Sequence, residues 1–555
     1  MVFHSAEDIA VPDVDLLSWI FSGQEYDKDK DVYIDALIPN RRLSAREAES
    51  RVRKLITSFR QHGIKEGDSV IVQSFGDIMY PIVFLAIVGV GAKFVGCNPG
   101  STAQELINLI TLTSARYVLT VPSRLPTVLE AIDINAPSAS ISKSNVFILD
   151  TPHDQFNPQG FSTVTDLCSQ SEEASELAGE SGSPDAGPNS GNRTAALFST
   201  SGTTGLPKVA AVSHRASIAR CVASWDPKPK SYAVSKLICL PMFHGVAATA
   251  SHIDPLRFGV QTYIQPRFEK HSFTMAIWEH KITETSMVPS IISMLLQQDE
   301  TMSKEDLKKY LHSLRIVRCA GASLDTGLQQ KFYELLHSEA RIVNAWGLTE
   351  AGTVTSFFGS ERDDTGSVGR LSPNFVARII DGNGRDVVVD GIPGDILVRG
   401  PSLMTDYHKN EDACKEAFFD GWLRTGDIGY CKEGKWYIVG RSKDMMKVRS
   451  WQVAPAEIEA CVMQHPLVLE VSVIGIKPLT IVGELPRAYV VLKYGSNVTS
   501  VMAEIHEMVG AVLAKYKALD GGITVVTSLP KTASGKVMKN VLRQKANEEL
   551  LNGIR

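Results

Sequence analysis

A glycine- and hydroxyl-rich stretch between two short apolar runs constrains this chain more than any other feature. The stretch Ser199-Thr-Ser-Gly-Thr-Thr-Gly-Leu-Pro-Lys208 lies between the apolar residues 195–198 and 209–212. Short hydroxyl side chains and flexible backbone provide many N–H and O–H donors without bulk, as a loop around a polyphosphate requires. Because the flanking runs have strand length, the pattern predicts two strands joined by a phosphate-binding loop.

The loop does not have the Walker spacing. That pattern needs Gly-x-x-x-x-Gly-Lys-Ser/Thr at the start of a helix, whereas Gly202 and Gly205 are three positions apart. Pro207 cannot donate a backbone hydrogen bond and disfavours helix at Leu206. The alternative is a solvent-exposed linker, and residues 169–194 just upstream have such a composition. The ordered Gly-Thr-Thr-Gly-x-Pro-Lys favours phosphate binding.

The length of 555 residues exceeds what one core ordinarily supports, so two to four domains or subdomains are expected. Strand patterns at 68–73, 117–121, 237–240, 260–264, 286–288 and 316–317 alternate with helical patterns, which indicates α/β layers with much parallel sheet. After Arg441 the pattern changes to a compact α+β unit, with a helix expected at 455–463. We therefore predict a large α/β N-terminal domain of layered sheets and helices, 1–440, and a small mobile α+β C-terminal domain, 441–555.

Composition excludes several classes of function. The net charge of −5 and the lack of basic runs argue against a nucleic-acid surface. The eight cysteines are scattered without Cys-x-x-Cys pairs, so a reduced compartment without structural zinc is expected. Apolar runs stay below the ~18 residues that a membrane span needs. Because the chain ends carry no secretory pattern and no peroxisomal tripeptide, we expect a cytoplasmic protein.

Five further segments combine charge, hydroxyl and glycine at turns. Asn344-Ala-Trp-Gly-Leu-Thr-Glu350 ends in a hydroxyl and a carboxylate, and Trp422-Leu-Arg-Thr-Gly-Asp427 places an aspartate on a turn. Gly440-Arg-Ser-Lys-Asp444 lies at the expected domain boundary and is followed by Lys447-Val-Arg-Ser-Trp-Gln452. Leu529-Pro-Lys-Thr-Ala-Ser-Gly-Lys536 presents a lysine near the end of the chain. Taken alone, each segment also fits an ordinary structural role, such as a turn, a helix start or a solvated lysine.

Together, in this order, the segments resemble the adenylate-forming superfamily of acyl-CoA synthetases, nonribosomal-peptide adenylation domains and beetle luciferases. The resemblance covers nearly the whole chain. It is closest to the 4-coumarate-CoA-ligase-like branch, through Gly347-Leu-Thr-Glu350 and Gln452-Val-Ala-Pro-Ala-Glu-Ile-Glu459. It implies an ATP-dependent enzyme with two half-reactions, in which a carboxylic acid is converted to an acyl-adenylate and the thiol of CoA then displaces AMP. Mg²⁺ and positive charge would offset repulsion between the two anionic reactants.

The resemblance also assigns roles to individual residues. Thr349 would contact the α-phosphate, Glu350 would bind Mg²⁺ together with Thr204, and Asp427 and Arg441 would bind the ribose. Lys447 and Gln452 match positions near the phosphate or carboxylate, and Arg267 is a weaker match to a basic residue near the CoA nucleotide. The β- and γ-phosphates would be held by Ser199, Thr200, Ser201, Gly202, Thr203, Thr204, Gly205 and Lys208. The adenine would lie between Gly321, Ala322 and Ser323 on one side and Asn344, Ala345, Trp346 and Gly347 on the other.

Three residues would act in catalysis or domain motion. Lys536 would reach the α-phosphate and the attacking carboxylate, but only when the small domain closes in one orientation. That domain would rotate about Lys443 between the half-reactions. His244 matches a histidine at the mouth of the acyl pocket, although a histidine after an apolar run also fits a structural role.

The positions that line the acyl pocket in the resembled branch are mostly small and apolar here. They are Gly245, Val246, Ala250, Gly321, Ala345, Gly347, Val354 and Thr355. This favours a hydrophobic or aryl carboxylic acid over a free amino acid. Arg318 lies next to these positions in sequence and would meet a polar substituent or pack at the surface.

Alternatives stay open at this point. Ser450, between a basic residue and Trp451, departs from the usual glycine and leaves room for another acceptor, either an amine or a separate carrier-protein thiol. A non-catalytic nucleotide sensor is a remote possibility that Lys536, Glu350 and Asp427 argue against. A light-emitting oxygenase shares the fold. Monomer and homodimer both fit the sequence.

Overall fold

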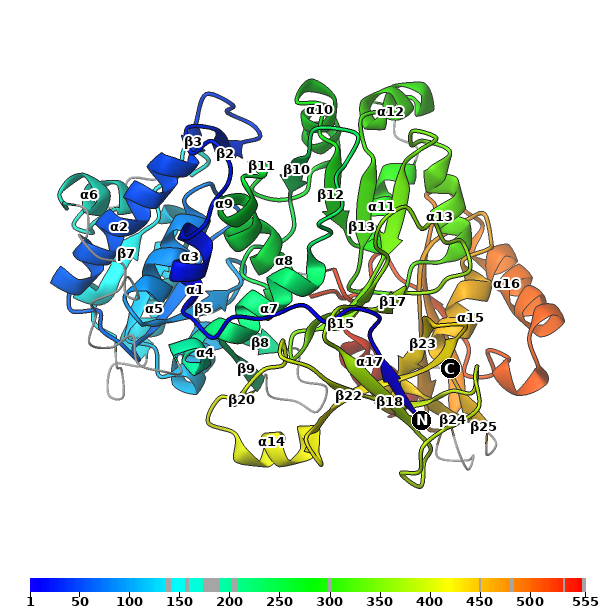
Figure 1. The fold of residues 1–555 in the computed structure, drawn as a ribbon. Helices are drawn as coiled ribbons and strands as arrows, with labels where there is room; N and C mark the ends of the chain where they lie inside the picture. The colour runs from blue at the N-terminus through cyan, green and yellow to red at the C-terminus, as the bar shows by residue number, and fades with distance from the viewer. Residues whose placement is uncertain are drawn as a thin grey trace.

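The computed structural model describes residues 1–134, 141–154, 159–172, 190–200, 208–297, 302–448, 451–478, 484–532 and 535–551 (Figure 1). Most of the predicted phosphate loop, including Ser201, Gly202, Thr203, Thr204 and Gly205, lies outside the described residues, as does Ser450. The loop's flanks are described. They form two adjacent antiparallel strands, as the sequence predicts.

The first large sheet joins these two strands to a parallel set. Its order within the described residues is β20 (Asp406–Tyr407), β9 (Lys208–Ser213), β8 (Thr194–Thr200), β5 (Lys93–Cys97), β4 (Ser69–Gln73), β6 (Tyr117–Thr120) and β7 (Val146–Ile148). The strands from β8 to β7 run parallel, and β9 and β20 are antiparallel to their neighbours. The helices of this part of the chain are α1 (Leu16–Phe21), α2 (Ala45–Gln61), α3 (Tyr80–Gly89), α4 (Ala103–Thr113), α5 (Leu125–Ile134), α6 (Val164–Ser169) and α7 (His214–Ser224).

Helices α2 and α3 show how local sequence determines these elements. Helix α2 begins with a reciprocal capping box between Ser44 and Glu47 and buries one apolar face, as its helical spacing predicts. Helix α3 is buried all round, because its sequence is an unbroken apolar run. It packs against α2 and β5 in the main core.

The second large sheet has the order β14 (Arg341–Asn344), β13 (Ile316–Cys319), β12 (Glu284–Met287), β10 (Ser235–Ile238), β11 (Gln261–Ile264), β2 (Asp31–Asp35) and β3 (Arg42–Ser44) in the described chain. All neighbouring pairs are parallel except β2 and β3. These strands confirm the predictions at 237–240, 260–264, 286–288 and 316–317. The accompanying helices are α8 (Gly245–Ala248), α9 (Asp254–Phe258), α10 (Lys270–Glu279), α11 (Pro289–Leu296), α12 (Lys304–Leu311) and α13 (Thr326–Tyr333).

A third, antiparallel sheet follows in the chain. It consists of β1 (Val2–His4), β18 (Val376–Ile380), β19 (Gly394–Arg399), β22 (Trp422–Lys432), β21 (Phe418–Phe419) and, paired with β22, β23 (Lys435–Arg441). Next to it lie the short strands β15 (Trp346–Leu348), β16 (Gly352–Ser356) and β17 (Arg370–Leu371), and helix α14 (Glu411–Ala417).

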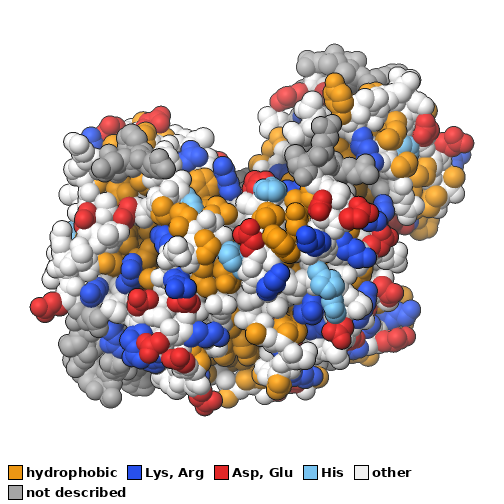
Figure 2. Space-filling view, turned by 90° about the horizontal axis from the view of Figure 1, so that it is seen from above, with side chains coloured by type: hydrophobic (Ala, Val, Ile, Leu, Met, Phe, Trp, Pro, Cys, Tyr) orange, Lys and Arg blue, Asp and Glu red, His pale blue; other side chains and the backbone are white. Residues whose placement is uncertain are grey.

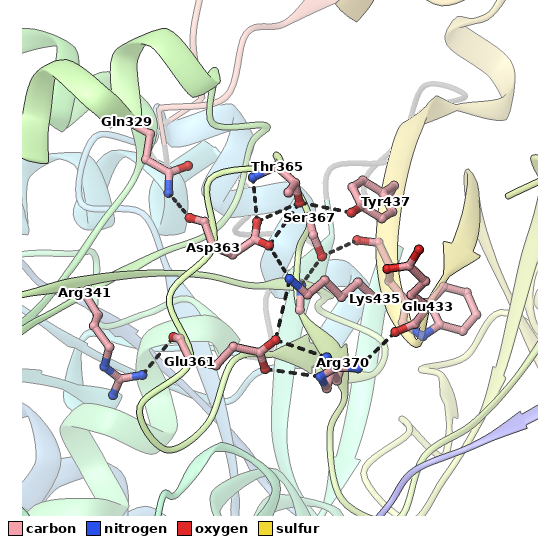
Figure 3. A network of polar contacts seen from close by, with 12 residues as sticks. Gln329, Arg341, Glu361, Asp363, Thr365, Ser367, Arg370, Glu433, Lys435 and Tyr437 are labelled. Carbon is pink, nitrogen blue, oxygen red and sulfur yellow. Dashed lines mark hydrogen bonds and ion pairs between the residues drawn. The ribbon is translucent and has the colours of Figure 1, made fainter.

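A polar network fixes strand β23 to the loop between β16 and β17 (Figure 3). The Nζ atom of Lys435 lies 2.7 Å from Oδ1 of Asp363 and 3.6 Å from Oε1 of Glu361. Arg370 donates two hydrogen bonds to the Glu361 carboxylate, a bidentate arrangement with defined geometry. The hydroxyl groups of Thr365 and Tyr437 are 3.0 Å apart. Strand β23, which ends at Arg441, is therefore attached to the large N-terminal part.

The C-terminal residues form separate sheets and separate hydrophobic cores. Strands β26 (Val468–Ile476), β27 (Leu485–Leu492) and β28 (Ile523–Val525) form one sheet, and β24 (Met446–Val448) pairs with β25 (Trp451–Val453). Two clusters of buried apolar side chains contain only residues from Met446 onward. These cores support the boundary at 440/441, which stays a prediction. The helices here are α15 (Pro455–Val462), α16 (Val498–Val512) and α17 (Lys539–Leu551).

Two further observations concern the surface and the helices. Side chains of both charge signs are interspersed over the face shown in Figure 2, without one dominant area of positive charge. Within the described ranges, every helix is too short or too polar to cross a membrane.

Candidate active site

A cavity of about 850 Å³ opens where the large sheets meet the C-terminal segment. Its walls come from the ends of β8 and β9, from β10, β12 and β13, from the loop after β14, from the β22–β23 hairpin, and from Lys531, Thr532, Lys536 and Met538. Fifteen of the predicted site residues line it: Ser199, Thr200, Lys208, His244, Gly245, Val246, Ala250, Gly321, Ala345, Gly347, Thr349, Glu350, Arg441, Lys443 and Lys536.

Asp427 and Arg441 form a fixed ion pair at one side of this cavity. They are direct partners in the β22–β23 register, and Nε of Arg441 lies 2.9 Å from Oδ1 of Asp427. The Trp346 indole donates to Oδ2 at 2.9 Å. Burial raises the pKa of the Asp427 carboxyl, and the charge of Arg441 opposes that rise. Two donors therefore hold the carboxylate in one orientation. Asp427 as a whole is only 4% exposed.

Lys536 enters the same cavity from the C-terminal segment. The loop before it is closed by the Gly535 N–H, which donates to the Thr532 carbonyl at 2.9 Å. Burial lowers the pKa of Lys536, and Arg441 acts in the same direction, whereas Asp427 opposes it. Burial likewise lowers the pKa of Lys443 to about 8. The cavity therefore concentrates positive charge on one side, which suits an anionic ligand.

The loop that carries Lys536 packs against the large N-terminal part. Gly535 has a φ of +81°, a conformation that favours glycine. A Cβ at this position would lie 3.0 Å from Oγ of Ser290 and 3.6 Å from Cγ2 of Val288. Both neighbours lie at the start of helix α11, so this loop contacts the large N-terminal part where Lys536 enters the cavity.

Glu350 is positioned by a residue that the sequence motifs did not indicate. The Tyr407 hydroxyl donates to Oε1 of Glu350 at 2.7 Å. Tyr407 lies on β20, which pairs with β9, and Nζ of Lys208 is 5.1 Å from the centre of its ring. The predicted metal ligand and the predicted phosphate-binding lysine therefore meet at one tyrosine.

Arg220 on α7 is a second residue that sequence reasoning missed. Its guanidinium donates to the carbonyl oxygens of Ser402, at 3.0 Å, and of Thr349, at 2.9 Å. Burial lowers the pKa of Arg220 to about 10, and the charge of Glu350 opposes the shift. An arginine in the middle of a helix carries no local signal for such a role. Through this hydrogen bond, Arg220 holds the backbone at Thr349 in place.

His244 precedes α8 and lines the cavity. Burial lowers its pKa to about 4, so the ring is neutral at pH 7. Its Nε2 atom is buried and has no hydrogen-bond partner within the described part of the chain. An unsatisfied buried nitrogen beside a cavity is available to a ligand.

The other predicted residues that the structure describes do not line the cavity. Asn344 bonds to the Ser367 carbonyl, and Lys447 and Gln452 are exposed partners on β24 and β25. The Arg267 guanidinium lies 5.9 Å from the centre of the Phe75 ring. Not lining the cavity are Ala322, Ser323, Asn344, Trp346, Val354, Thr355, Asp427, Lys447, Gln452 and Arg267. Val354 and Thr355, predicted as acyl contacts, are fully buried; Val354 belongs to an apolar cluster, and the Thr355 hydroxyl donates to the Val368 carbonyl at 2.8 Å.

The residues that the structure describes contain no cluster of three or more His, Cys, Asp or Glu side chains suited to a metal ion. All eight cysteines are free thiols.

Comparison with known proteins gives consistent matches over nearly the whole chain. Residues 22–408 match the model of the AMP-binding enzyme family, and residues 457–536 match that of the AMP-binding enzyme C-terminal domain. The phenylacetyl-CoA ligase epaB of Aspergillus niger is 38% identical, over 99% of this chain and 100% of that protein. The nicotinic acid-CoA ligase pyr1 of Aspergillus fumigatus is 34% identical, over 96% of each chain. The crystal structure of the anthranilate CoA ligase AuaEII with anthranoyl-AMP shares the fold, with a TM-score of 0.84, 22% identity, and coverage of 97% of this chain and 99% of that one.

Proposed function

Because the chain belongs to the AMP-binding enzyme family, we propose that it is an acid–CoA ligase that uses ATP. It activates a hydrophobic or aryl carboxylic acid as an acyl-adenylate and passes the acyl group to the thiol of CoA. The observation that carries this proposal is the convergence of Lys536, Glu350 and Arg441 on one cavity, with Asp427 paired to Arg441 just behind the cavity wall. These residues come from distant parts of the chain and supply the charges that the two half-reactions need.

In the first half-reaction, a carboxylate oxygen of the acid forms a bond to the α-phosphorus of ATP. The bond from this phosphorus to the bridging oxygen breaks, and pyrophosphate leaves with that oxygen. Negative charge increases on the oxygens of the α-phosphate, where Lys536 and the Thr349 loop would lie. Asp427 and Arg441 would accept and donate hydrogen bonds at the ribose hydroxyls and hold the nucleotide in place.

In the second half-reaction, the CoA sulfur attacks the acyl carbonyl carbon, and the bond to AMP breaks. Neutral His244 would face the reacting carboxyl group, and its unpartnered Nε2 would donate a hydrogen bond to the carbonyl oxygen in the tautomer that carries the proton there. Lys536 would leave the cavity when its domain turns about Lys443, since the contact of Gly535 with α11 belongs to the closed arrangement. The domain boundary and this rotation are part of the proposal.

The residues present fit a Mg²⁺ ion that arrives with ATP. Magnesium in nucleotide sites takes one or two carboxylates together with phosphate oxygens and water. Glu350 offers such a carboxylate, with Oε1 fixed by Tyr407 and the group facing the cavity. When bound, the ion would neutralise phosphate charge. Thr204, the other predicted ligand, lies outside the described residues.

Replacing Tyr407 by phenylalanine is expected to lower the adenylation rate about 10-fold and to raise the Mg²⁺ concentration needed for half-maximal rate. The lost hydrogen bond is to a charged carboxylate, which is worth ~1.5–3 kcal/mol. ATP–pyrophosphate exchange across a magnesium titration measures both quantities. Tyr430→Phe, at a β22 position that does not line the cavity, is the matched control. An unchanged magnesium requirement would contradict the positioning role.

The overall function is tested with a panel of aryl, fatty and polyketide-like acids. We expect ATP–pyrophosphate exchange with at least one aryl acid, and thioester formation when CoA is added. Failure of every acid to support exchange would refute the ligase assignment. An amide formed from an added amine, or an acylated carrier protein, with no CoA thioester would instead identify a different acceptor.

A further inference from the structure

A fully buried histidine, His252, lies beside the cavity without lining it. It belongs to the π-helical turn η4 (Thr249–Ile253), which follows α8 and contributes two other residues to the cavity lining. The centre of its ring lies 5.4 Å from that of Tyr80 and 4.6 Å from that of Phe84, both on α3, and the rings are stacked. π-helical turns are rare and often occur at functional sites, so the role of this histidine is of interest.

The ring of His252 makes a hydrogen bond to the backbone just before His244. Its Nε2 atom lies 3.0 Å from the carbonyl oxygen of Met242. Because a carbonyl can only accept, Nε2 carries a proton and donates it. Burial lowers the pKa of His252 to about 3, so the ring is neutral at pH 7. A polar group buried among aromatic rings costs free energy unless it is hydrogen-bonded, and the bond to Met242 therefore constrains both partners.

Residues 241–244 form a turn between β10 and α8, and His244 is its last residue. The His244 N–H donates to the first carbonyl of the turn at 3.3 Å. The turn also packs closely against β5, where a Cβ added at Gly96 would overlap the carbonyl oxygen of Phe243. The backbone before His244 is therefore held by two neighbours, the β5 strand at Gly96 and the imidazole of His252.

We infer that His252 is a positioning residue for thioester formation, because its hydrogen bond to Met242 holds the turn that presents His244 to the reacting acyl group. The inference rests on the proposed ligase function and adds to it a residue that does not line the cavity. A hydrogen bond from Nε2 of His244 to the acyl carbonyl oxygen contributes fully only when the ring stays within about 0.5 Å of its productive position. The bond from His252 also connects that turn to η4, which forms part of the cavity wall.

The rate of acyl transfer tests the inference. Single-turnover transfer from the preformed acyl-adenylate to CoA is followed with the acid of the panel that supports the fastest exchange. His252→Phe keeps a ring in the stack but removes the donor, and should lower this rate about 10-fold, the effect of one buried hydrogen bond left unmade. ATP–pyrophosphate exchange should stay within about twofold of wild type, since His244 would act in the second half-reaction. His252→Gln retains an N–H donor and should restore most of the transfer rate. His252→Met lacks the donor and fits irregular cores, so it replaces His252→Phe if that variant does not fold.

A double-mutant cycle separates positioning from a general loss of stability. In the His244→Ala background, His252→Phe should change the transfer rate by less than about twofold, because the ring that it positions is absent. The control Tyr80→Phe removes a hydroxyl from the same aromatic stack, one without a hydrogen-bond partner among the described residues, and should behave as wild type. The inference is overturned by an undiminished effect of His252→Phe in the His244→Ala background, or by equal losses of exchange and transfer. Both leave the ligase function intact, whereas an absence of exchange with every acid refutes the ligase function itself.

Discussion

Lys536→Ala is expected to lower ATP–pyrophosphate exchange by about 10²–10³-fold while ATP binding stays near the wild-type level. The ammonium group would stabilise charge that develops at the α-phosphate only as the new bond forms, so its loss affects the rate more than the ground state. Exchange kinetics and calorimetric titration with ATP measure the two effects separately. Lys545→Ala, an exposed lysine on α17, is the control and should behave as wild type.

The pH profile provides a second readout of Lys536. Its pKa is lowered by burial, so its charge is lost at a lower pH than for an exposed lysine, and adenylation should decline early on the alkaline side. Lys536→Arg keeps the charge at all relevant pH values and should extend the active range upward, whatever its absolute rate. Exchange in Lys536→Ala at the wild-type rate would remove the catalytic assignment.

The second large effect is expected at Asp427. Asp427→Asn should weaken ATP binding about 10- to 100-fold, because one charged acceptor is lost and Arg441 is left without its ion-pair partner. Calorimetry at fixed magnesium measures the dissociation constant, and thermal unfolding shows whether the fold persists. The control Asp420→Asn changes an exposed turn aspartate in the same region. Wild-type affinity in Asp427→Asn would refute the ribose contact.

The elements that could be predicted were those with a local pattern. The apolar runs around the phosphate loop became β8 and β9, and the helix expected at 455–463 became α15. Asp427, Arg441 and Lys536 could be predicted as site residues because each belongs to a short motif with a distinct order of residues. The loop between β8 and β9 lies outside the described residues, so its predicted phosphate contacts stay predictions.

The residues that sequence reasoning missed are brought together by tertiary structure. Tyr407 stands 57 positions from Glu350, and Arg220 stands 129 positions from Thr349. No local spacing in the sequence indicates contacts over such separations.

The attachment of β23 to the loop between β16 and β17 has a consequence for the order of product release. Asp427 and Arg441 sit on a hairpin that the Lys435 network ties to the large domain, and the proposed pivot at Lys443 follows only two residues later. The nucleotide would therefore stay behind when the small domain swings away with Lys536. On this view pyrophosphate departs first, the thioester second, and AMP is the last to dissociate, which makes AMP a competitive inhibitor with respect to ATP.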